Sequence, residues 1–266
     1  MNEPFLNAEF SKLWAGKDPF VELASIEGEV FRQQTGRKTF LFAINGKSYF
    51  AKLHSGVGWR EIFKNLLKLN LPVVSARNEW LAVNRLHELE IATMTAVAYG
   101  ERGRNPATRN SFIVTEALLD TVSLEDYCLD WKEHAPNFQL KRRLIEKLAN
   151  ISRLMHENNI GHRDFYLCHF LMHMEDGKPR ADLRLSLIDL HRALIKPNLR
   201  ERWIVKDIAG LYYSAMHIGL GKRDLLRFVK CYDRADLHSV QRHRLAFWSA
   251  VTDRAEAMYR KQGPSR

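Results

Sequence analysis

The run His162-Arg163-Asp164, which follows directly on the end of a predicted helix, constrains this chain more than any other feature. Apolar residues recur at helical spacing over residues 138–158, and Gly161 adds a stop signal after them. Asp164 is therefore expected on a loop, where its carboxylate can accept a proton from a hydroxyl group. A simple ion pair between Asp164 and its neighbour Arg163 remains the alternative.

A predicted β-hairpin follows this loop and ends in a second aspartate. Its strands are expected over residues 170–174 and 183–188, with a turn at Asp176-Gly177, and Asp189 stands at the end of the second strand. A carboxylate at a strand end is a common ligand for Mg²⁺ on phosphates. Protein-kinase-like enzymes place their base and metal ligand in this order, so the pattern predicts phosphoryl transfer to a hydroxyl, with Asp164 as base and Asp189 as metal ligand.

A lysine and a glutamate in the first third of the chain fit the nucleotide side of such a reaction. Lys52 lies on a predicted strand, and Glu79 lies 27 positions later on a helix expected over residues 76–89. In kinases the lysine holds the α- and β-phosphates and the glutamate holds the lysine. Glu61 and Glu88 remain alternatives to Glu79.

The segments expected to contact the rest of the nucleotide carry weaker signals. No G-x-G-x-x-G and no P-loop motif occurs in the sequence. Backbone N–H groups of the turn Gln34-Thr35-Gly36 can still cover phosphates. Backbone groups of Glu116 and Ala117 are expected to pair with adenine. We therefore assign Gly36, Glu116 and Ala117 to the nucleotide site.

Two further residues are expected to support the site. His169, five positions after Asp164, stands where a protein kinase has a metal-binding asparagine, so it is either a metal ligand or a group that orients Asp164 or a phosphate. Asp207 is expected to brace the His162-Arg163 loop, and a helix cap is the alternative.

The bulk composition restricts partners and compartment. The chain has 266 residues, a formal net charge of +10 and a pI of about 9.6. This charge favours an acidic partner, namely nucleic acid, an anionic membrane surface, an acidic protein or a phosphorylated substrate, and a merely solvated basic surface remains the alternative. Three widely spaced cysteines indicate a reducing compartment. We see no signal peptide, no run of about 18 apolar residues and no nucleic-acid-binding motif, so a cytoplasmic protein that binds no nucleic acid is expected.

The order of predicted elements indicates an α+β fold with two lobes. Strands are expected over residues 29–32, 39–44, 47–53 and 111–115, with a hairpin turn at Asn45-Gly46. Everything after Trp203 has a helical pattern. We therefore predict a β-rich N-terminal domain over residues 1–117 and a helical C-terminal domain over 118–266.

Taken together, these residues resemble the lipopolysaccharide core heptose(I) kinase family. The likeness runs over nearly the whole chain and is most specific at residues 162–170 and 188–191. It implies a protein-kinase-like fold, ATP and Mg²⁺ as cofactors, a catalytic site with Asp164 and Arg163, metal ligation by Asp189 with His169, and action in the cytoplasm on a glycolipid. The departures from ordinary protein kinases are His169 in place of Asn and Leu-His after Asp189.

The sequence favours a sugar acceptor over a protein. Only 18 positions separate Asp189 from Asp207, too few for a segment that docks a peptide. A basic and apolar insert within residues 52–77 could lie on the anionic inner membrane or pack on the first lobe. The alternatives are a kinase of protein side chains or of another small hydroxylated substrate, and an inactive scaffold that binds an acidic partner protein.

Overall fold

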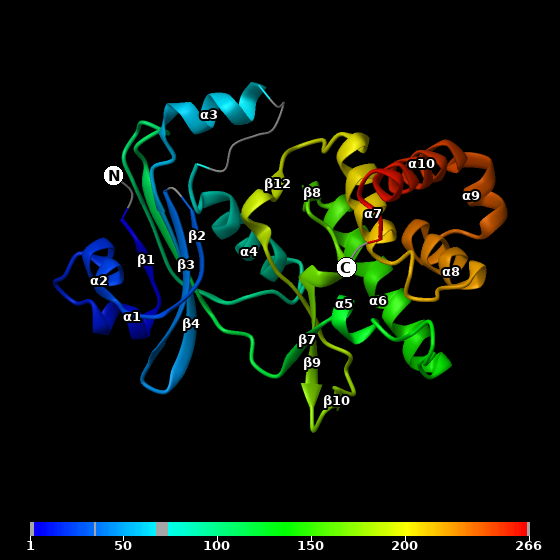
Figure 1. Ribbon diagram of the computed structural model, residues 1–266, viewed down its shortest axis with the longest axis horizontal. Coiled ribbons are helices and arrows are strands. Elements are labelled where there is room, and N and C mark those ends of the chain that lie inside the picture. The colour runs from blue at the N-terminus through cyan, green and yellow to red at the C-terminus, as the bar shows by residue number, and fades with distance from the viewer. Residues whose placement is uncertain (1–2, 35, 68–73, 265–266) are drawn as a thin grey trace. The chain divides into compact units, whose positions relative to one another are not determined.

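The computed structural model describes residues 3–34, 36–67 and 74–264, and these residues form two compact units (Figure 1). The first unit comprises residues 1–85 and 94–118, and the second comprises residues 86–93 and 119–266. Residues 86–93 join the second unit because Leu187 donates its N–H to the Ala92 carbonyl at 2.9 Å, and the Thr93 hydroxyl donates to the Leu187 carbonyl at 2.6 Å. The mixture of helix and sheet confirms the predicted α+β class.

An antiparallel six-stranded sheet forms the frame of the first unit. The strand order is β1 (Phe5–Leu6), β5 (Ala96–Arg102), β6 (Asn110–Glu116), β4 (Lys47–Ser55), β3 (Arg37–Ile44), β2 (Glu29–Gln34). The predicted hairpin at Asn45-Gly46 is confirmed, and both turn residues have the positive φ, 51° and 76°, that a two-residue hairpin turn of this kind requires. The strands are longer than predicted because pairing in the sheet extends them beyond their apolar centres.

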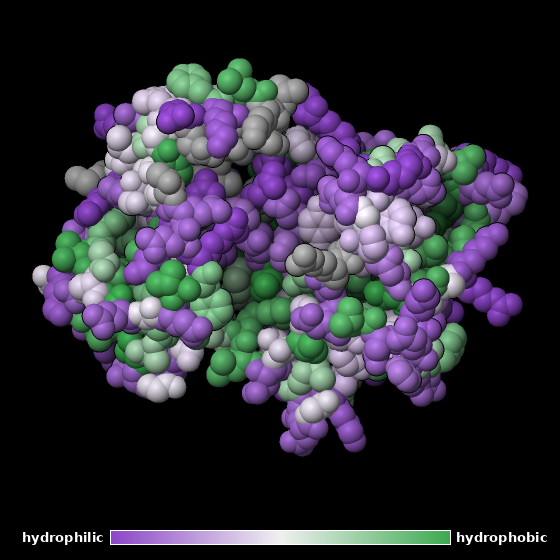
Figure 2. Space-filling model, in the orientation of Figure 1, coloured by the Kyte–Doolittle hydropathy of each residue, from purple (hydrophilic) through white to green (hydrophobic). Residues whose placement is uncertain are grey.

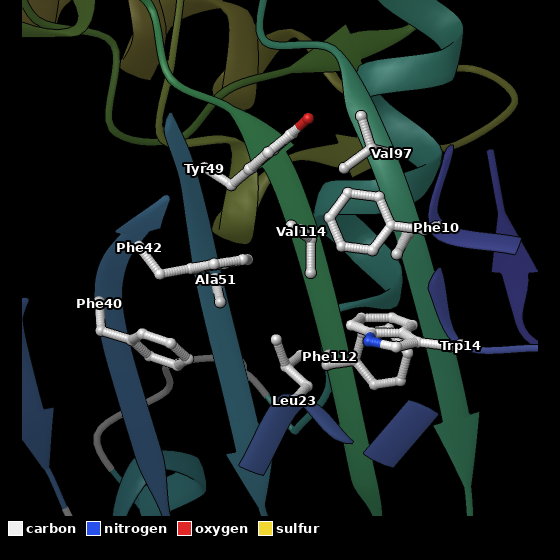
Figure 3. Close-up of a cluster of buried hydrophobic side chains, with 11 residues drawn as sticks. Phe10, Trp14, Leu23, Phe40, Phe42, Tyr49, Ala51, Val97, Phe112 and Val114 are labelled. Atoms are coloured by element: carbon white, nitrogen blue, oxygen red, sulfur yellow. The ribbon is translucent and has the colours of Figure 1, made fainter. Parts of the chain in front are cut away.

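The core of the first unit covers one face of this sheet (Figure 3). Tyr49 and Ala51 of β4 are fully buried and pack with Phe10 and Leu23, which come from two short helices, α1 (Ala8–Leu13) and α2 (Pro19–Ser25). Successive strand residues point to opposite faces, so this burial places Lys52 on the face away from the core, as the alternation predicted. The two helices themselves were not predicted.

Two further helices complete the first unit. Most of α4 (Arg77–Glu88) belongs to it, and α3 (Gly58–Leu67) precedes the gap at residues 68–73. Ile62 of α3 is buried and packs with Val57 and Ala107. The side chains of Trp59 and Phe63 are 50% and 58% exposed. The α3 helix therefore packs through one side and leaves large apolar side chains in contact with solvent.

The second unit combines a small sheet with a group of helices. The predicted hairpin is confirmed as β9 (Phe170–Glu175) and β11 (Leu185–Leu187), with Leu187 opposite Phe170, and β7 (Thr121–Ser123) and β10 (Lys178–Pro179) also pair with β9. A separate pair joins β8 (Ile160–Gly161) to β12 (Leu194–Ile195). The helices are α5 (Leu124–Tyr127), α6 (Phe138–Glu157), α7 (Glu201–Ser214), α8 (Lys222–Asp233), α9 (Leu237–His243) and α10 (Leu245–Gln262).

The long helix α6 ends one residue before the predicted boundary, so this prediction is confirmed. Ala149 of α6 packs with Ile208 of α7, Tyr232 of α8 and Phe247 of α10. This packing holds α6 and α7 together, and both contact β8, which leads directly into His162, Arg163 and Asp164. Among the described helices, none combines the length and low polarity needed to cross a bilayer.

Candidate active site

Asp207 holds the loop that contains His162, Arg163 and Asp164. It lies on α7, is 1% exposed, and accepts the backbone N–H groups of His162 at 2.6 Å and Arg163 at 2.7 Å. The predicted brace is therefore confirmed. Arg163 has a φ of 74°, a conformation that costs a non-glycine residue about 1–3 kcal/mol and needs such fixed partners.

His162 joins this loop to the one that carries Asp189. Its ring is fully buried, and Nε2 donates a hydrogen bond to the Ile188 carbonyl, 3.0 Å away. Burial lowers the pKa of His162, and the Asp207 charge opposes this shift only in part, so the ring is neutral at pH 7. A neutral buried imidazole thus links the two aspartate loops.

His169 makes a second link between the same loops. Its Nδ1 lies 2.6 Å from the Asp164 carbonyl, to which it must donate, and its Nε2 lies 3.5 Å from Oδ2 of Asp189. In the neutral tautomer that this bond selects, Nε2 presents a lone pair toward a carboxylate. Two acceptors at this separation suit a cation that lies against both.

Asp189 has a left-handed backbone conformation, with φ 61° and ψ 50°, at the start of a short 3₁₀ turn, η2 (Leu190–Arg192). This turn brings His191 back onto the Asp189 carboxylate, where its Nδ1 makes a short hydrogen bond to Oδ1. The sequence marked Leu190-His191 as a departure from protein kinases but gave His191 no role. The Leu-His pair that follows Asp189 therefore supplies a direct partner for its carboxylate.

Arg192, at the end of the same turn, is the partner of Asp164. Its Nη1 lies 2.9 Å and 3.1 Å from the two carboxylate oxygens of Asp164. The pair of Asp164 with Arg163, considered from the sequence, does not form, because the Arg163 guanidinium lies over the Trp203 ring at 5.3 Å. Arg192 was missed because only the fold of η2 brings it close to Asp164.

The donor set near Asp189 fits a metal ion that is shared with phosphate groups. In the described ranges, no cluster of three or more His, Cys, Asp or Glu side chains could hold a metal by itself. Mg²⁺ is usually held by one or two carboxylates together with substrate phosphates and water. Asp189, with His169 beside it, has this limited character, and its side chain is 31% exposed.

In the first unit, Lys52 and Glu79 form an ion pair. The Nζ of Lys52 lies 2.6 Å from Oε1 of Glu79, whose side chain is 1% exposed. The structure thus joins the two residues that the sequence paired, and it leaves the Lys52 side chain 24% exposed. Glu88, one alternative, is exposed at the end of α4, and the side chain of Glu61 lies outside the described residues.

Gly36 occupies a place that only glycine fits. Its φ is 74°, and a Cβ there would lie 2.3 Å from the carbonyl oxygen of Gly56. Its own carbonyl accepts the N–H of Ser55 at 2.9 Å. Thr35, which belongs to the same predicted phosphate turn, lies outside the described residues. This close backbone contact explains why residue 36 is a glycine, whether or not the turn covers a ligand.

The backbone N–H groups of the predicted adenine segment are bonded within the first unit. Glu116 donates to the Thr95 carbonyl, and Ala117 donates to the Ser48 carbonyl, each at 2.9 Å. A nucleotide can therefore approach these two residues through their carbonyl oxygens, which accept hydrogen bonds, and not through their N–H groups.

An apolar cavity of about 160 Å³, which the sequence did not predict, lies within the second unit. Its lining includes Trp131, Leu144, Leu148, Leu211, Phe228 and Val251. An apolar cavity of this order stays dry and can bind an apolar molecule. A second, open hollow beside α8 is lined by four cationic side chains, Arg142, Arg227, Lys230 and Arg234, and by two acidic ones, Glu146 and Asp236.

Comparison with known proteins gives one consistent result. Residues 21–232 match the model of the lipopolysaccharide kinase (Kdo/WaaP) family. The lipopolysaccharide core heptose(I) kinase WaaP of Pseudomonas aeruginosa is 47% identical over 257 residues, which cover 97% of this chain and 96% of that protein. The Escherichia coli protein of the same description is 46% identical over 250 residues, 94% of each chain.

A solved structure agrees with these sequence matches. The structure described as WaaP in complex with acyl carrier protein matches with a TM-score of 0.83 and 43% identity, and the match covers 97% of this chain and 100% of that one. The predicted protein-kinase-like fold class is thereby confirmed.

The buried neutral state of His162 makes stability depend on pH. Because its pKa is lowered in the folded state, the unfolded chain binds a proton below about pH 6.5 that the folded chain does not. The free energy of unfolding should therefore fall as the pH falls below about 6.5, by at most about 1.4 kcal/mol per pH unit for this group. His162→Gln, whose amide can still donate to Ile188, should flatten this part of the curve in denaturant titrations from pH 7.5 to 5.

The exposed His134 gives a matched control. His134→Gln should follow the wild-type curve. Superimposable curves for wild type and His162→Gln would contradict the assignment of a neutral His162.

Proposed function

Because this chain belongs to the lipopolysaccharide kinase (Kdo/WaaP) family, we propose that it transfers the terminal phosphoryl group of ATP to a heptose hydroxyl of the lipopolysaccharide inner core. The observation that carries this proposal is the linkage of the two aspartate loops in the second unit. His162 bonds to the carbonyl of Ile188, and His169 bonds to the carbonyl of Asp164 while it faces Asp189. A base and a metal ligand are thus held in one rigid arrangement, which phosphoryl transfer requires.

Asp164 acts as the general base in this proposal. Its carboxylate accepts the proton of the acceptor hydroxyl as the phosphoryl group is transferred. Arg192 holds both carboxylate oxygens and so fixes their direction. Arg163 contributes through its backbone N–H, which Asp207 fixes, and through a guanidinium that adds positive charge near the reacting groups.

Lys52, Asp189 and His169 serve the nucleotide. Lys52, held by Glu79, contacts the α- and β-phosphates, and the turn at Gly36 and the carbonyl groups of Glu116 and Ala117 approach the phosphates and adenine. Asp189 with His169 would hold Mg²⁺, which neutralises charge on the phosphates when it is bound. Consumption of ATP places the reaction in the cytoplasm.

The alternatives explain less. A kinase of protein side chains needs a docking segment, and the stretch from Asp189 to Asp207 is short and largely used in η2, β12 and the start of α7. An inactive scaffold would not need Lys52, Asp164 and Asp189 together. All three are present, and Lys52 and Asp164 lie in charge-paired environments.

The α3 helix supports association with the anionic surface of the inner membrane. Trp59, Phe63 and Leu67 follow one another at intervals of four residues and are 50%, 58% and 86% exposed. Hydrophobic atoms gather over α3 at the top of Figure 2. Arg60 and Lys64 are exposed on the same helix, and this combination suits a helix that lies in the interface of an anionic bilayer. Lys68, also assigned to this insert, lies outside the described residues.

The cavity and the basic hollow support an acyl-bearing acidic partner. Phe228 lines the cavity, while Arg227 and Lys230, its neighbours on α8, line the hollow. An acyl chain suits the first and an acidic protein surface suits the second. The related WaaP structure is described as a complex with acyl carrier protein. We therefore include acyl carrier protein among the partners of this chain.

The base assignment predicts a specific loss of turnover. Asp164→Asn should lower phosphate transfer from ATP to purified core lipopolysaccharide by on the order of 10²-fold or more, because a general base typically contributes that much. Nucleotide binding with Mg²⁺, measured by calorimetry, should persist in this variant. Asp189→Ala should lose that Mg²⁺-dependent binding, and His169→Ala should weaken it in part.

Asp182→Asn, in the exposed connection between β10 and β11, is the matched control and should behave as wild type. A panel of peptides tested in the same assay separates sugar from protein acceptors. Near wild-type turnover of Asp164→Asn would remove Asp164 as the base.

The carrier proposal predicts that binding depends on the acyl chain. Acyl carrier protein with a long acyl chain should co-elute with this protein in size-exclusion chromatography, and the carrier without an acyl chain should not. Leu148→Trp, which fills the cavity, should weaken binding by about 5- to 150-fold, since overpacking an apolar site costs about 1–3 kcal/mol. Leu226→Trp, on the exposed side of α8, should leave binding unchanged. Equal binding of both carrier forms would contradict the proposal.

The membrane proposal predicts a strong effect of three side chains. Replacement of Trp59, Phe63 and Leu67 together by serine should lower the partition onto phosphatidylglycerol-containing vesicles by at least about 10²-fold. The exposed parts of the three side chains amount to about two whole side chains, and each fully buried apolar side chain contributes about 1.5–3 kcal/mol. Binding should also fall as salt rises, since screening weakens the attraction of Arg60 and Lys64. Phe138→Ser, an exposed aromatic residue on α6, is the control. Unchanged co-sedimentation of the triple variant would show that α3 is not the membrane contact.

A further inference from the structure

The stretch between Asp189 and Asp207 carries a strong excess of positive charge. Residues 190–206 contain a single acidic residue, Glu201, and five basic residues, Arg192, Lys196, Arg200, Arg202 and Lys206. Glu201 lies 3.7 Å from Arg244, which is outside this stretch. The basic residues therefore have no acidic partner within their own segment, and most lie on or beside α7.

Several of these charges meet at the catalytic loop. The guanidinium groups of Arg163 and Arg202 both lie over the Trp203 ring, at 5.3 Å and 4.8 Å. Lys206 follows Trp203 by one turn of α7 and directly precedes Asp207, which bonds the catalytic loop. The positive charges of Arg163, Arg192 and Lys206 oppose one another, and an anion between like charges relieves such repulsion.

The nearby carboxylates are already engaged. Asp207 accepts two backbone N–H groups of the loop, and Asp164 accepts both its bonds from Nη1 of Arg192. The structure, over the residues it describes, shows no carboxylate within 4.0 Å of the cationic groups of Arg163 or Lys206. Arg163 is 6% exposed, and its Nε has no hydrogen-bond partner there. A guanidinium has five N–H groups, so Arg192 also has donors beyond those that Asp164 uses.

The electrostatics of Lys206 agree with this surplus of charge. Burial lowers the pKa of its ammonium group, the Asp164 carboxylate opposes that change, and the charges of Arg192 and Arg163 lower the pKa further. Burial likewise lowers the pKa of Arg163, and Arg192 adds to the effect. A bound anion would relieve the cost of holding these cations together.

We propose that Arg163, Arg192 and Lys206 form a subsite for an anionic group, a carboxylate or a phosphate, that the sugar acceptor carries beside its reactive hydroxyl. This inference rests on the proposed function and names the kind of acceptor. Charge-assisted hydrogen bonds to such a group are directional, and Arg192 contacts both the subsite and Asp164. Binding of the anion thus brings the neighbouring hydroxyl to the base, and a neutral sugar lacks this anchor.

The test is a double-mutant cycle between enzyme and acceptor. Wild type and Lys206→Met are assayed with deacylated core oligosaccharide in three forms: unmodified, with its carboxylates converted to methyl amides, and with its phosphates removed. For wild type, the loss of the recognised anion should raise the acceptor KM roughly 10- to 100-fold, as expected for a hydrogen bond to a charged group. The KM for ATP should not change. Lys206→Met should raise the acceptor KM by a similar factor and no longer distinguish the modified acceptor from the unmodified one.

Lys178→Met, an exposed lysine in the hairpin, removes the same charge and should keep the wild-type discrimination. Lys206→Arg should restore part of the discrimination between acceptors that Lys206→Met loses. The modified acceptor that loses affinity identifies the anion as carboxylate or phosphate. Discrimination that persists in Lys206→Met, or a rise in the KM for ATP alone, would overturn the proposal, the latter because the cluster would then serve the nucleotide. Absence of turnover by wild type on the unmodified acceptor would instead show that the proposed function itself is wrong.

Discussion

The carboxylate of Asp207 is the interaction on which the catalytic loop depends. It is buried on α7 and accepts the N–H groups of two successive residues, His162 and Arg163. Without it, two buried donors would lack partners, at a cost of about 1–3 kcal/mol each. The left-handed backbone of Arg163, which directs Asp164 away from the helix before it, would lose its support. The position of Asp164 thus depends on Asp207, a buried residue of another element.

From Asp207 the restraints continue around the site. The ring of His162 donates a hydrogen bond to the carbonyl of Ile188, the residue that precedes Asp189. The ring of His169 donates from Nδ1 to the carbonyl of Asp164, and its Nε2 faces Asp189. The loops that carry Asp164 and Asp189 are therefore positioned by bonds from imidazoles to backbone carbonyls, while the two carboxylates, which Arg192 and His191 contact, stay partly exposed. This separation of supporting bonds from reacting groups suits a reaction in which the protein mainly positions charge.

The sequence predicted the parts of this arrangement that follow from local periodicity. Alternation in the strand of Lys52, helical spacing around Glu79 and over α6, and turn residues in two hairpins were each sufficient to place their elements. Arg192 and His191 could not be predicted, because their direction depends on the left-handed Asp189 and on the turn η2. The helices α1 and α2 were missed although Asn7 and Asp18 cap them and Pro19 begins the second, since helices of six and seven residues show little periodicity. The cavity depends on how five separate α-helices, α5, α6, α7, α8 and α10, pack, which no local pattern records.

The hairpin between the two aspartates has a consequence for how relatives of this chain can be recognised. Strand β9 and strand β11 are in register at Phe170 and Leu187, and the N–H of Ile188 closes the pair on the carbonyl of His169. The distance in space between Asp164 and Asp189 is therefore restrained at the open end of the hairpin, away from its turn. Its far end, around Asp176 and Gly177, is exposed, and insertions or deletions at such a tip are usually tolerated. Homologues can lengthen or shorten this tip during evolution without moving either carboxylate, so a search pattern with a fixed interval of 25 positions would overlook them.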